Sequence, residues 1–334
     1  SAFRADHHGP HMLSFIAQRL VKGVIVLLAI VVLNFFLIRL APGDPAVVMA
    51  GEAGASDKVF VDQLRQKFGL DRPLPEQLLI YVKGIASFDL GFSFRQQAPV
   101  AQLILERLPA TLLLTLTAFL ISLAFGILFG VLAARFAGTF MDTAITVLAL
   151  IFYATPLFWI ALIAILVFSV WVDWLPSFGY ETVGGNYTGF RHALDVGAHL
   201  IMPAATLGLF FMATYTRMTR ASMLEVRRLD FVKTARAKGL RDSVIQRRHV
   251  LRNALLPVVT LAGVHAGTLV GGAVLTETVF AWPGIGRLMY DALIQRDYNL
   301  LLGVFVVCSA MVLIFNLVTD LVYRLVDPRI EFAA

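Results

Sequence analysis

The chain has 334 residues, of which 58% are hydrophobic and 15% are charged, and its mean hydropathy is +0.78. A soluble domain has about a quarter of its residues charged, so this composition excludes a soluble globular protein and indicates an integral membrane protein. The net charge of +6 is explained by basic cytoplasmic loops without any role for nucleic acid, and the single cysteine, Cys308, excludes a disulfide framework or a cysteine metal site within the chain.

The first segment, residues 1–11, is short, contains histidines and ends just before Met12. We expect it to be a cloning remnant or a disordered end that does not belong to the fold. The apolar run at 24–38 has no small-residue cleavage site after it, so we expect a retained membrane span and not a cleaved signal.

Six segments are long and apolar enough to cross about 30 Å of hydrocarbon. Their expected bounds are Leu20–Leu40, Ala110–Ala134, Thr143–Val172, Leu200–Thr216, Leu256–Val279 and Leu300–Tyr323. The chain then divides into a first span at 12–40, a segment at 41–102 and a core of spans two to six at 103–334. The segment at 41–102 has balanced charge and many prolines and glycines, so we expect a helical cap that lies on the spans. The fold class is all-α.

Loop charges set the orientation of the spans, because Lys and Arg gather on the cytoplasmic side. The loop between spans four and five holds eleven of the 28 Lys and Arg, and Arg324 and Arg329 follow the last span. The loop at 173–199 has one arginine against three acids, so it faces outward. We therefore expect both termini in the cytoplasm and the cap at 41–102 outside it.

The centres of the spans hold almost no ionisable group, with His265 as the exception. Carriers that are coupled to ions or protons usually need charged residues at that depth, so this pattern argues against a self-powered secondary transporter. The chain also has no GxxxxGK[ST] phosphate-binding loop. If the chain moves a solute, we expect the energy to come from another protein.

The segment at 230–257, DFVKTARAKGLRDSVIQRRHVLRNALLP, is the one long charged stretch in the C-terminal half. Eleven Lys and Arg against three acids lie between Arg217 and Arg252, and apolar residues recur among them. Gly239 divides these apolar residues into two groups, which predicts two short amphipathic helices with a glycine break. Such a segment lies on lipid, binds anions or docks into another protein.

Four motifs follow one another along the chain. They are MLSFIAQRL at 12–20, APGDP at 41–45, FVKTARAKGL at 231–240 with HVLRNALLP at 249–257, and ETVFAWPGIG at 277–286 followed by RDY at 296–298. In this order they resemble the membrane-spanning permease subunits of ABC importers, most closely the first of the two paired permeases in the dipeptide, oligopeptide and nickel branch. The resemblance covers roughly residues 12–330.

The resemblance implies that the segment at 230–257 couples the membrane spans to an ATPase subunit, by sitting in a cleft of that subunit and moving spans four and five with it. The coupling residues implied are Ala235, Arg236, Ala237, Lys238, Gly239, Leu240 and Arg241. The general signature begins Glu-Ala-Ala, where this chain has Lys233-Thr234-Ala235. The alternative is a solvated basic loop that has no partner.

Local helix chemistry adds detail to the same segment. Glycine adopts a positive φ at little cost, so Gly239 is expected to end the first short helix. Asp242 or Ser243 is expected to cap the second helix, because both side chains accept hydrogen bonds from backbone N–H groups.

Several residues within the spans are candidates for a translocation path, with ordinary helix packing as the alternative. They are Gly263, His265, Gly267, Gly271 and Pro156. The glycines form a GxxxGxxxG face, which lets helices pack closely in lipid, either beside a second permease or within this chain. For His265 we expect a hydrogen-bonded or pore-facing side chain and no metal site, because no second ligand stands at metal-binding spacing. Pro156 is expected to kink or break the third span, with the path or a plain structural kink as its two interpretations.

Three residues near the outer end of span five are candidates for an outer gate or for contact with a solute-binding protein. They are Glu277, Trp282 and Asp297. The alternative for the two acids is a surface-facing or ion-paired carboxylate. The run from Trp282 to Gly286 predicts a tight re-entrant turn.

The resemblance implies one half of the translocation path of an ATP-driven importer of di- or oligopeptides in the cell (inner) membrane. The implied partners are a second homologous permease, two ATPase subunits, an extracytoplasmic solute-binding protein and membrane lipid. We expect no enzymatic activity and no cofactor in this chain, with ATP and Mg bound by the ATPase subunits, because we find neither a Ser/His/Asp constellation nor paired carboxylates within a span. The alternatives are an importer of nickel chelates or glutathione and, in a different class, a channel or facilitator without ATP coupling.

Overall fold

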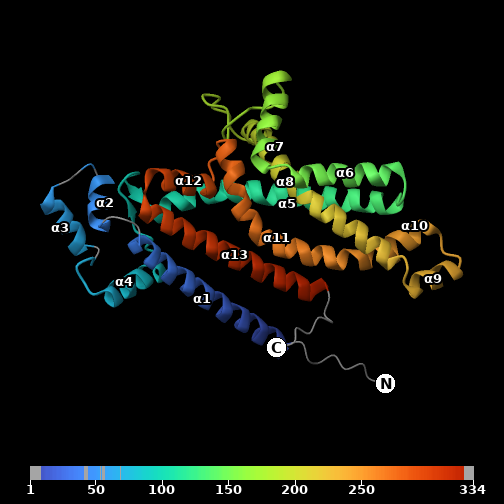
Figure 1. Cartoon of the computed structure of the whole chain (residues 1–334), viewed down its shortest axis with the longest axis horizontal. Coiled ribbons are helices and arrows are strands. Elements are labelled where there is room, and N and C mark those ends of the chain that lie inside the picture. The colour runs from blue at the N-terminus through green and yellow to red at the C-terminus, as the bar shows by residue number, and fades with distance from the viewer. Residues whose placement is uncertain (1–8, 41–43, 53, 55–56, 68, 327–334) are drawn as a thin grey trace. The chain divides into compact units, whose positions relative to one another are not determined.

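The structure is a computed structural model, and it describes residues 9–40, 44–52, 54, 57–67 and 69–326. These residues form long helices, shown in Figure 1, and belong to two compact units. Unit 1 comprises residues 1–106 and 288–317, and unit 2 comprises residues 107–287 and 318–334. The segment at 1–11, expected to be a remnant or a disordered end, lies mostly outside the described residues, and the first helix begins at Gly9.

Unit 1 contains one long N-terminal helix, three short helices and a small hairpin. The helices are α1 (Gly9–Leu40), α2 (Pro45–Glu52), α3 (Lys58–Lys67) and α4 (Leu74–Ala86), and the hairpin pairs β1 (Phe92–Ser93) with β2 (Ala98–Pro99) in antiparallel fashion. Most of α12 (Ile285–Gln295) and of α13 (Tyr298–Val326) completes the unit. The short helices lie in the segment predicted to be a helical cap, and α4 packs against α1. The hairpin was not predicted.

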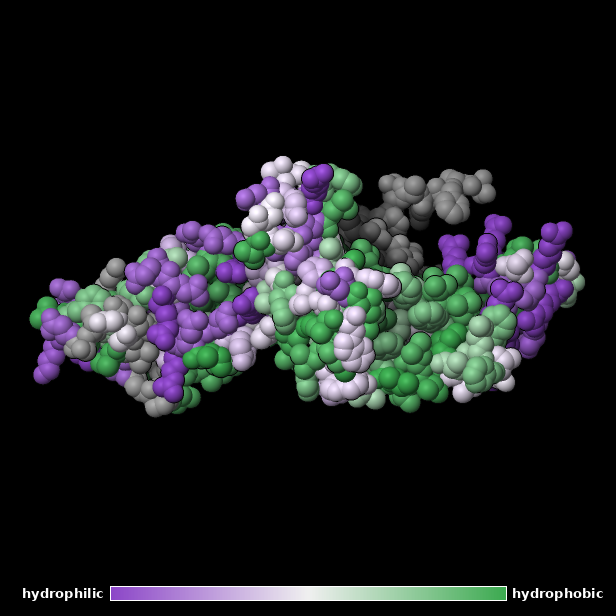
Figure 2. All heavy atoms as spheres, turned by 90° about the horizontal axis from the view of Figure 1, so that it is seen from above, coloured by the Kyte–Doolittle hydropathy of each residue, from purple (hydrophilic) through white to green (hydrophobic). Residues whose placement is uncertain are grey.

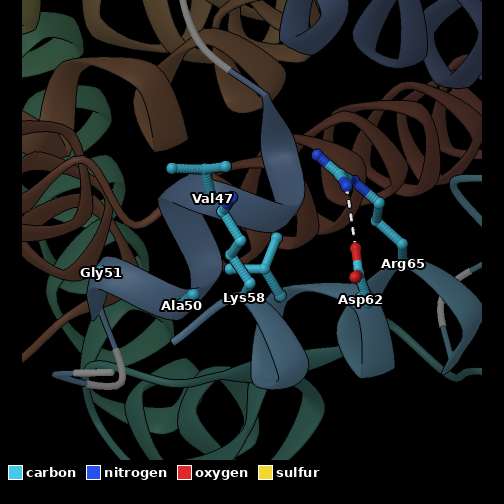
Figure 3. A pocket seen from close by; sticks show the side chains of 7 residues that line it. Val47, Ala50, Gly51, Lys58, Asp62 and Arg65 are labelled. Atoms are coloured by element: carbon cyan, nitrogen blue, oxygen red, sulfur yellow. Dashed lines mark hydrogen bonds and ion pairs between the residues drawn. The ribbon is translucent and has the colours of Figure 1, made fainter. Parts of the chain in front are cut away.

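Helices α2 and α3 pack on each other through a small apolar core and an ion pair. Ala46, Ala50, Val61 and Leu64 are buried between them. The Arg65 guanidinium lies against the Asp44 carboxylate and lowers the pKa of that carboxyl below its usual value. A cavity of about 480 Å³ lies beside this core, and Figure 3 shows Lys58 at it and Arg65 joined to Asp62.

Unit 2 is a bundle whose central helix is α8. The helices, in chain order, are α5 (Val100–Arg135), α6 (Phe140–Ala154), α7 (Leu157–Ala164), the π-helical η1 (Ile165–Trp171), α8 (Phe190–Val226), α9 (Asp230–Ala237), α10 (Asp242–Val244), the π-helical η2 (Ile245–Leu251) and α11 (Arg252–Val279). Helix α8 packs against α6, α7 and α11. Its buried residues include Leu207 and Tyr215, which contribute to two apolar clusters of the unit.

Glycines bring α5 and α8 into close contact. A Cβ atom on Gly130 would lie 2.8 Å from the Thr216 carbonyl oxygen, and one on Gly126 would lie 3.1 Å from the Met212 carbonyl oxygen. On the other helix, a Cβ on Gly208 would lie 3.0 Å from the Ala118 carbonyl oxygen. Larger residues at these positions would hold the helices apart, so the close crossing depends on glycine.

Four helices among the described residues are long and apolar enough to span a membrane: Ala17–Leu37, Val100–Arg135, Phe190–Val226 and Tyr298–Thr319. The predicted third span is broken: Phe140–Ala154 and Leu157–Trp171 meet at 104°, and as one bent unit they make a fifth candidate. Pro156 precedes α7, so the predicted break at this proline is confirmed. The residue before a proline is pushed away from helical angles, and Thr155 is accordingly extended, with ψ 133°. Helix α11 covers the segment predicted as span five.

Candidate functional site

The segment at 230–257, called the basic segment below, has the two-part form that its sequence predicts. Helix α9 ends at Ala237, and Gly239 follows with φ +74°. The Gly239 N–H donates to the Arg236 carbonyl oxygen at 2.9 Å, which closes the end of the helix. The chain then enters α10 and η2, and η2 runs directly into α11. The basic segment is therefore joined without a flexible linker to one of the long helices.

The expected cap of the second helix is wrong. Asp242 is the first residue of α10, Arg241 holds the capping position, and no side chain caps this helix. The Arg241 carbonyl oxygen instead accepts from the N–H groups of Val244 and Ile245 at 2.9 and 3.1 Å. The backbone of Arg241 is extended, with ψ 140°, and this places the start of the helix one residue earlier than a cap at Asp242 would require.

The apolar face of the basic segment is buried in a cluster, called the terminal cluster below. Its buried members are Ala134 of α5, Met223 of α8, Val232 and Ala235 of α9, Ile245 and Val250 of η2, and Ala254 of α11. The segment thus packs on the ends of α5 and α8 within unit 2. A solvated loop without structure would not bury this face.

The predicted coupling residues divide into one buried residue and six exposed ones. Ala235 is 5% exposed and belongs to the terminal cluster. The exposed residues are Arg236, Ala237, Lys238, Gly239, Leu240 and Arg241. Figure 2 shows hydrophilic side chains gathered at the end of unit 2 that holds α9 and α10, next to a hydrophobic surface. These six residues form an exposed, strongly basic turn with Leu240 as an apolar residue within it.

Two arginines at the C-terminal end of α8 bind neighbouring helices close to the basic segment. Arg227, which directly follows α8, donates from Nη1 to the Ala134 carbonyl oxygen at 2.5 Å and from Nε to Gln246 Oε1 at 3.1 Å. Arg220 donates from Nε and Nη2 to the two Asp142 carboxylate oxygens at 2.6 and 2.8 Å. The sequence shows both arginines only as loop charges, because Ala134 lies 93 residues from Arg227 and Asp142 lies 78 residues from Arg220.

Glu277 and Trp282 lie at the other end of α11, in a buried turn. Glu277 is 0% exposed, accepts from Thr111 Oγ1 at 2.7 Å through Oε1, and accepts from the Arg287 N–H at 3.0 Å through Oε2. Trp282, also 0% exposed, donates from Nε1 to the Ala110 carbonyl oxygen at 2.9 Å. The Glu277 carboxylate therefore holds the start of α12 and the helix α5 together.

Asp297 has a similar internal role within unit 1. It is 1% exposed, accepts a hydrogen bond from Ser93 Oγ, and accepts from the Leu300 N–H at 3.1 Å. It therefore caps the first turn of α13. The alternative of a surface-facing carboxylate is wrong for Glu277 and Asp297, because both are buried. The expectation that Glu277, Trp282 and Asp297 belong to an outer gate or contact a solute-binding protein stays a prediction. All three side chains are buried in this structure and hydrogen bond within the chain.

Four of the five residues proposed for a path or for helix packing lie in α11, and the fifth, Pro156, precedes α7. Thr319 Oγ1 donates to the Gly263 carbonyl oxygen at 3.3 Å. The His265 ring packs against Phe211 and Tyr215, with centroids 5.5 and 5.6 Å apart. Gly267 and Gly271 lie in α11, but the surroundings of residues 267–272 lie outside the described part of the structure. No cluster of three metal-ligating side chains occurs among the described residues.

Comparisons with known proteins cover nearly the whole chain. Residues 126–332 match the family described as binding-protein-dependent transport system inner membrane component, and residues 12–115 match the N-terminal family of the same transport systems. The chain is 42% identical over 334 residues to the di/tripeptide transport system permease protein DppB of Pseudomonas aeruginosa strain UCBPP-PA14, covering 96% of this chain and 99% of that protein. It is 40% identical over 337 residues to the dipeptide transport system permease protein DppB of Escherichia coli K12, with the same coverages.

Solved structures agree on the fold. An inward-facing structure of the MetNI methionine ABC transporter matches with a TM-score of 0.54 at 22% identity, over 68% of this chain and 97% of that chain. A second crystal form of the same transporter matches with a TM-score of 0.55 at 21% identity, with the same coverages. At this level of identity the match describes the arrangement of helices.

Proposed function

Because the chain belongs to the family of binding-protein-dependent transport system inner membrane components, we propose that it is a permease subunit of an ATP-driven importer of di- and oligopeptides. The observation that carries this function is the identity of 40–42% to dipeptide and di/tripeptide permeases over 96% of the chain. Such a subunit is a multi-pass protein of the inner membrane and forms one half of the translocation path.

The proposed topology has six spans, with both termini in the cytoplasm. The spans are α1, α5, the bent unit of α6, α7 and η1, α8, α11 and α13. Basic loops at the ends of α5 and α8 support this orientation. The three short helices α2, α3 and α4 then lie on the outer side of the membrane.

The exposed basic turn at 236–241 is the proposed contact with an ATPase subunit. Its structure supports this role because the turn is accessible while Ala235 anchors it to the terminal cluster. A force on the turn would reach α11 directly, since η2 continues into that helix without a break. Two packings of the bundle, each favoured by one nucleotide state of the ATPases, would then alternate the access of the path.

The proposed assembly contains a second homologous permease, two ATPase subunits and an extracytoplasmic solute-binding protein. The ATPase subunits would bind ATP and Mg and carry out hydrolysis, while this chain takes no part in that chemistry. Two permeases related by approximate symmetry would enclose the path between them. Glu277, Trp282 and Asp297 remain the candidates for an outer gate or for contact with the solute-binding protein.

The function is tested by reconstituting the chain with its second permease, the two ATPases and the solute-binding protein in liposomes. We expect uptake of a radiolabelled dipeptide that requires ATP on the side of the basic segment and stops when the ATPase subunits carry an inactivating substitution. A nickel chelate and glutathione, supplied with the same complex, test the alternative cargoes. Uptake of dipeptide that continues without ATP would instead identify a channel or facilitator.

A further inference from the structure

Arg227 lies at a point where three elements meet, at the boundary between the bundle and the basic segment. It follows α8, its Nη1 reaches the end of α5 at Ala134, and its Nε reaches Gln246 of η2. The basic segment is connected along the chain only to α8 and α11. The end of α5 is far away in sequence, so the two Arg227 hydrogen bonds make a connection that the backbone does not provide.

The chemistry of both contacts suits arginine. The Ala134 carbonyl is among the last four of α5, and these carbonyls have no partner within the helix. A cation at a helix C-terminus is also favoured by the helix dipole. The planar guanidinium presents several donors in a fixed fork, so one side chain can satisfy a backbone carbonyl and an amide oxygen at the same time.

Arg227 and its neighbour Arg228 differ in burial and in the contacts of their side chains. Arg227 is partly buried at the edge of the terminal cluster, and burial lowers the pKa of its guanidinium while the group stays charged. Its neighbour Arg228 is exposed; its N–H donates to the Glu225 carbonyl oxygen at 3.0 Å, but its side chain has no hydrogen bond or ion pair with any residue that the structure describes. Two adjacent arginines therefore carry the same charge in the same loop, but only one of them joins helices.

Apolar packing alone would hold these elements together without fixing their register. Ala134 belongs to the terminal cluster, so apolar contacts would keep α5 against the basic segment even without hydrogen bonds. Apolar contacts are non-directional, and small residues such as alanine allow one surface to slide over another. The two directional hydrogen bonds of Arg227 would oppose that sliding.

Arg220 makes a related connection on the same helix. It precedes Arg227 by two helical turns, so both lie on one face of the α8 axis. Arg220 binds Asp142 in the first turn of α6, and Arg227 binds the last turn of α5. The two arginines thus hold both sides of the short connection between α5 and α6.

We propose that Arg227 is a positioning residue that makes the end of α5 move as one body with the basic segment, so that a displacement of the exposed turn reaches α5 as well as α8 and α11. This proposal rests on the proposed function, because it concerns how movement of an ATPase is passed to the path. In this proposal α5 moves together with the basic segment, α8 and α11 when the ATPase moves. Arg227 transmits that movement, whereas the other cations of the loop do not.

The test compares Arg227→Met with the matched control Arg228→Met in the reconstituted complex, with dipeptide uptake and ATP hydrolysis measured on the same sample. The readout is the number of dipeptides imported per ATP hydrolysed. Poor folding lowers both rates together and leaves this ratio unchanged, whereas loss of transmission lowers the ratio. We expect a drop of about five-fold or more for Arg227→Met and the wild-type ratio for Arg228→Met. A wild-type ratio in Arg227→Met would overturn the proposal.

A second variant decides the question if Arg227→Met does not assemble. Gln246→Ala keeps the bond to Ala134 and removes only the link to η2, so it should lower the ratio by a smaller factor. A normal ratio in Gln246→Ala would then count against the proposal. If the wild-type complex shows no ATP-dependent uptake at all, the proposed function fails and the role of Arg227 is judged by the spectroscopic measurement that follows.

Spin labels at exposed Arg135 and Arg247, introduced as cysteines in a Cys308→Ala background, report the separation between the end of α5 and η2. The wild-type chain in its complex should give one narrow distance distribution, and Arg227→Met a broader one. Arg228→Met should match the wild type. Equal widths in all three samples would show that Arg227 does not fix the register of the two elements.

Discussion

Glu277 occupies the space that a side chain at Gly284 would need. A Cβ atom built on Gly284 would overlap the carboxylate of Glu277, and nothing else stands as close to it. The same carboxylate accepts from Thr111 and from the backbone of Arg287. The motif ETVFAWPGIG is thus a closed structural unit in which the first residue fills the turn made by the last ones.

We predict that Gly284→Ala destabilises the folded chain by about 1–3 kcal/mol, as is usual for overpacking a closely packed site. Most of this cost should disappear when Glu277 is also replaced by alanine, because the obstacle is then gone. The measurement is a double-mutant cycle on the apparent Tm of the complex in detergent. If the free-energy costs of Gly284→Ala and Glu277→Ala simply add in the double variant, the two residues are not in contact.

Gly286→Ala is the matched control for this cycle. A Cβ atom there would lie 2.7 Å from Val274 Cα, which is backbone, as well as 2.9 Å from Glu277 Oε2. Replacing Glu277 does not move the backbone of α11. The cost of Gly286→Ala should therefore persist in the double variant.

We predict that Glu277→Gln destabilises the chain by about 1–3 kcal/mol although it hardly changes the shape of the side chain. The carboxylate accepts hydrogen bonds through both of its oxygens, whereas a glutamine offers one oxygen and turns an NH₂ group toward a donor. One buried donor is then left without an acceptor, which costs an amount of this order. The exposed Glu225→Gln is the control and should stay within about 0.5 kcal/mol of the wild type in the same thermal measurement.

Features that depend on local sequence were predictable from the residues. The helix break at Gly239 and the broken third span at Pro156 follow from the backbone preferences of glycine and proline, and both are present. The amphipathic character of the basic segment likewise follows from its apolar spacing, and its apolar face is buried as expected. These properties require no knowledge of a distant partner.

Contacts between distant residues were not predictable in this way. Nothing in the sequence indicates that Glu277 is buried against Thr111, because this partner lies 166 residues earlier. Arg227 looked like one more loop cation because its acceptors belong to α5 and η2. Only the fold brings these groups together, so a single sequence cannot distinguish a buried carboxylate from an exposed one.

The close crossing of α5 and α8 is an intermediate case. Gly126 and Gly130 have the same four-residue spacing as the glycines of α11, so the sequence contains the signal for this crossing. What the spacing does not reveal is which helix lies opposite. The structure supplies that answer, since the atoms facing these glycines belong to Met212, Tyr215, Thr216 and Thr219 of α8.

We predict that Gly130→Ala destabilises the α5–α8 crossing by about 1–3 kcal/mol, because a methyl at this position would meet the Thr216 carbonyl oxygen at 2.8 Å. Gly197→Ala, in α8, is the matched control because a Cβ there has open space around it. It should be neutral or stabilising by up to about 1 kcal/mol, since alanine is the better helix former. Thermal unfolding of the two variants in the same detergent makes the comparison, and equal Tm values would contradict the crossing.

Gly239 lies in the exposed basic turn. Its φ of +74° is strained for an L-residue, while a Cβ at this position would meet nothing within 4 Å. The penalty for a substitution therefore comes from backbone conformation and not from side-chain size. We predict that Gly239→Ala raises the free energy of the native turn by about 1–2 kcal/mol and lowers ATP-dependent dipeptide uptake, with membrane insertion intact.

Gly239→Asn, although larger, should retain more uptake because asparagine tolerates the left-handed conformation. The measurement is uptake per inserted complex, and an asparagine variant no better than the alanine variant would mean that backbone conformation is not what this position requires.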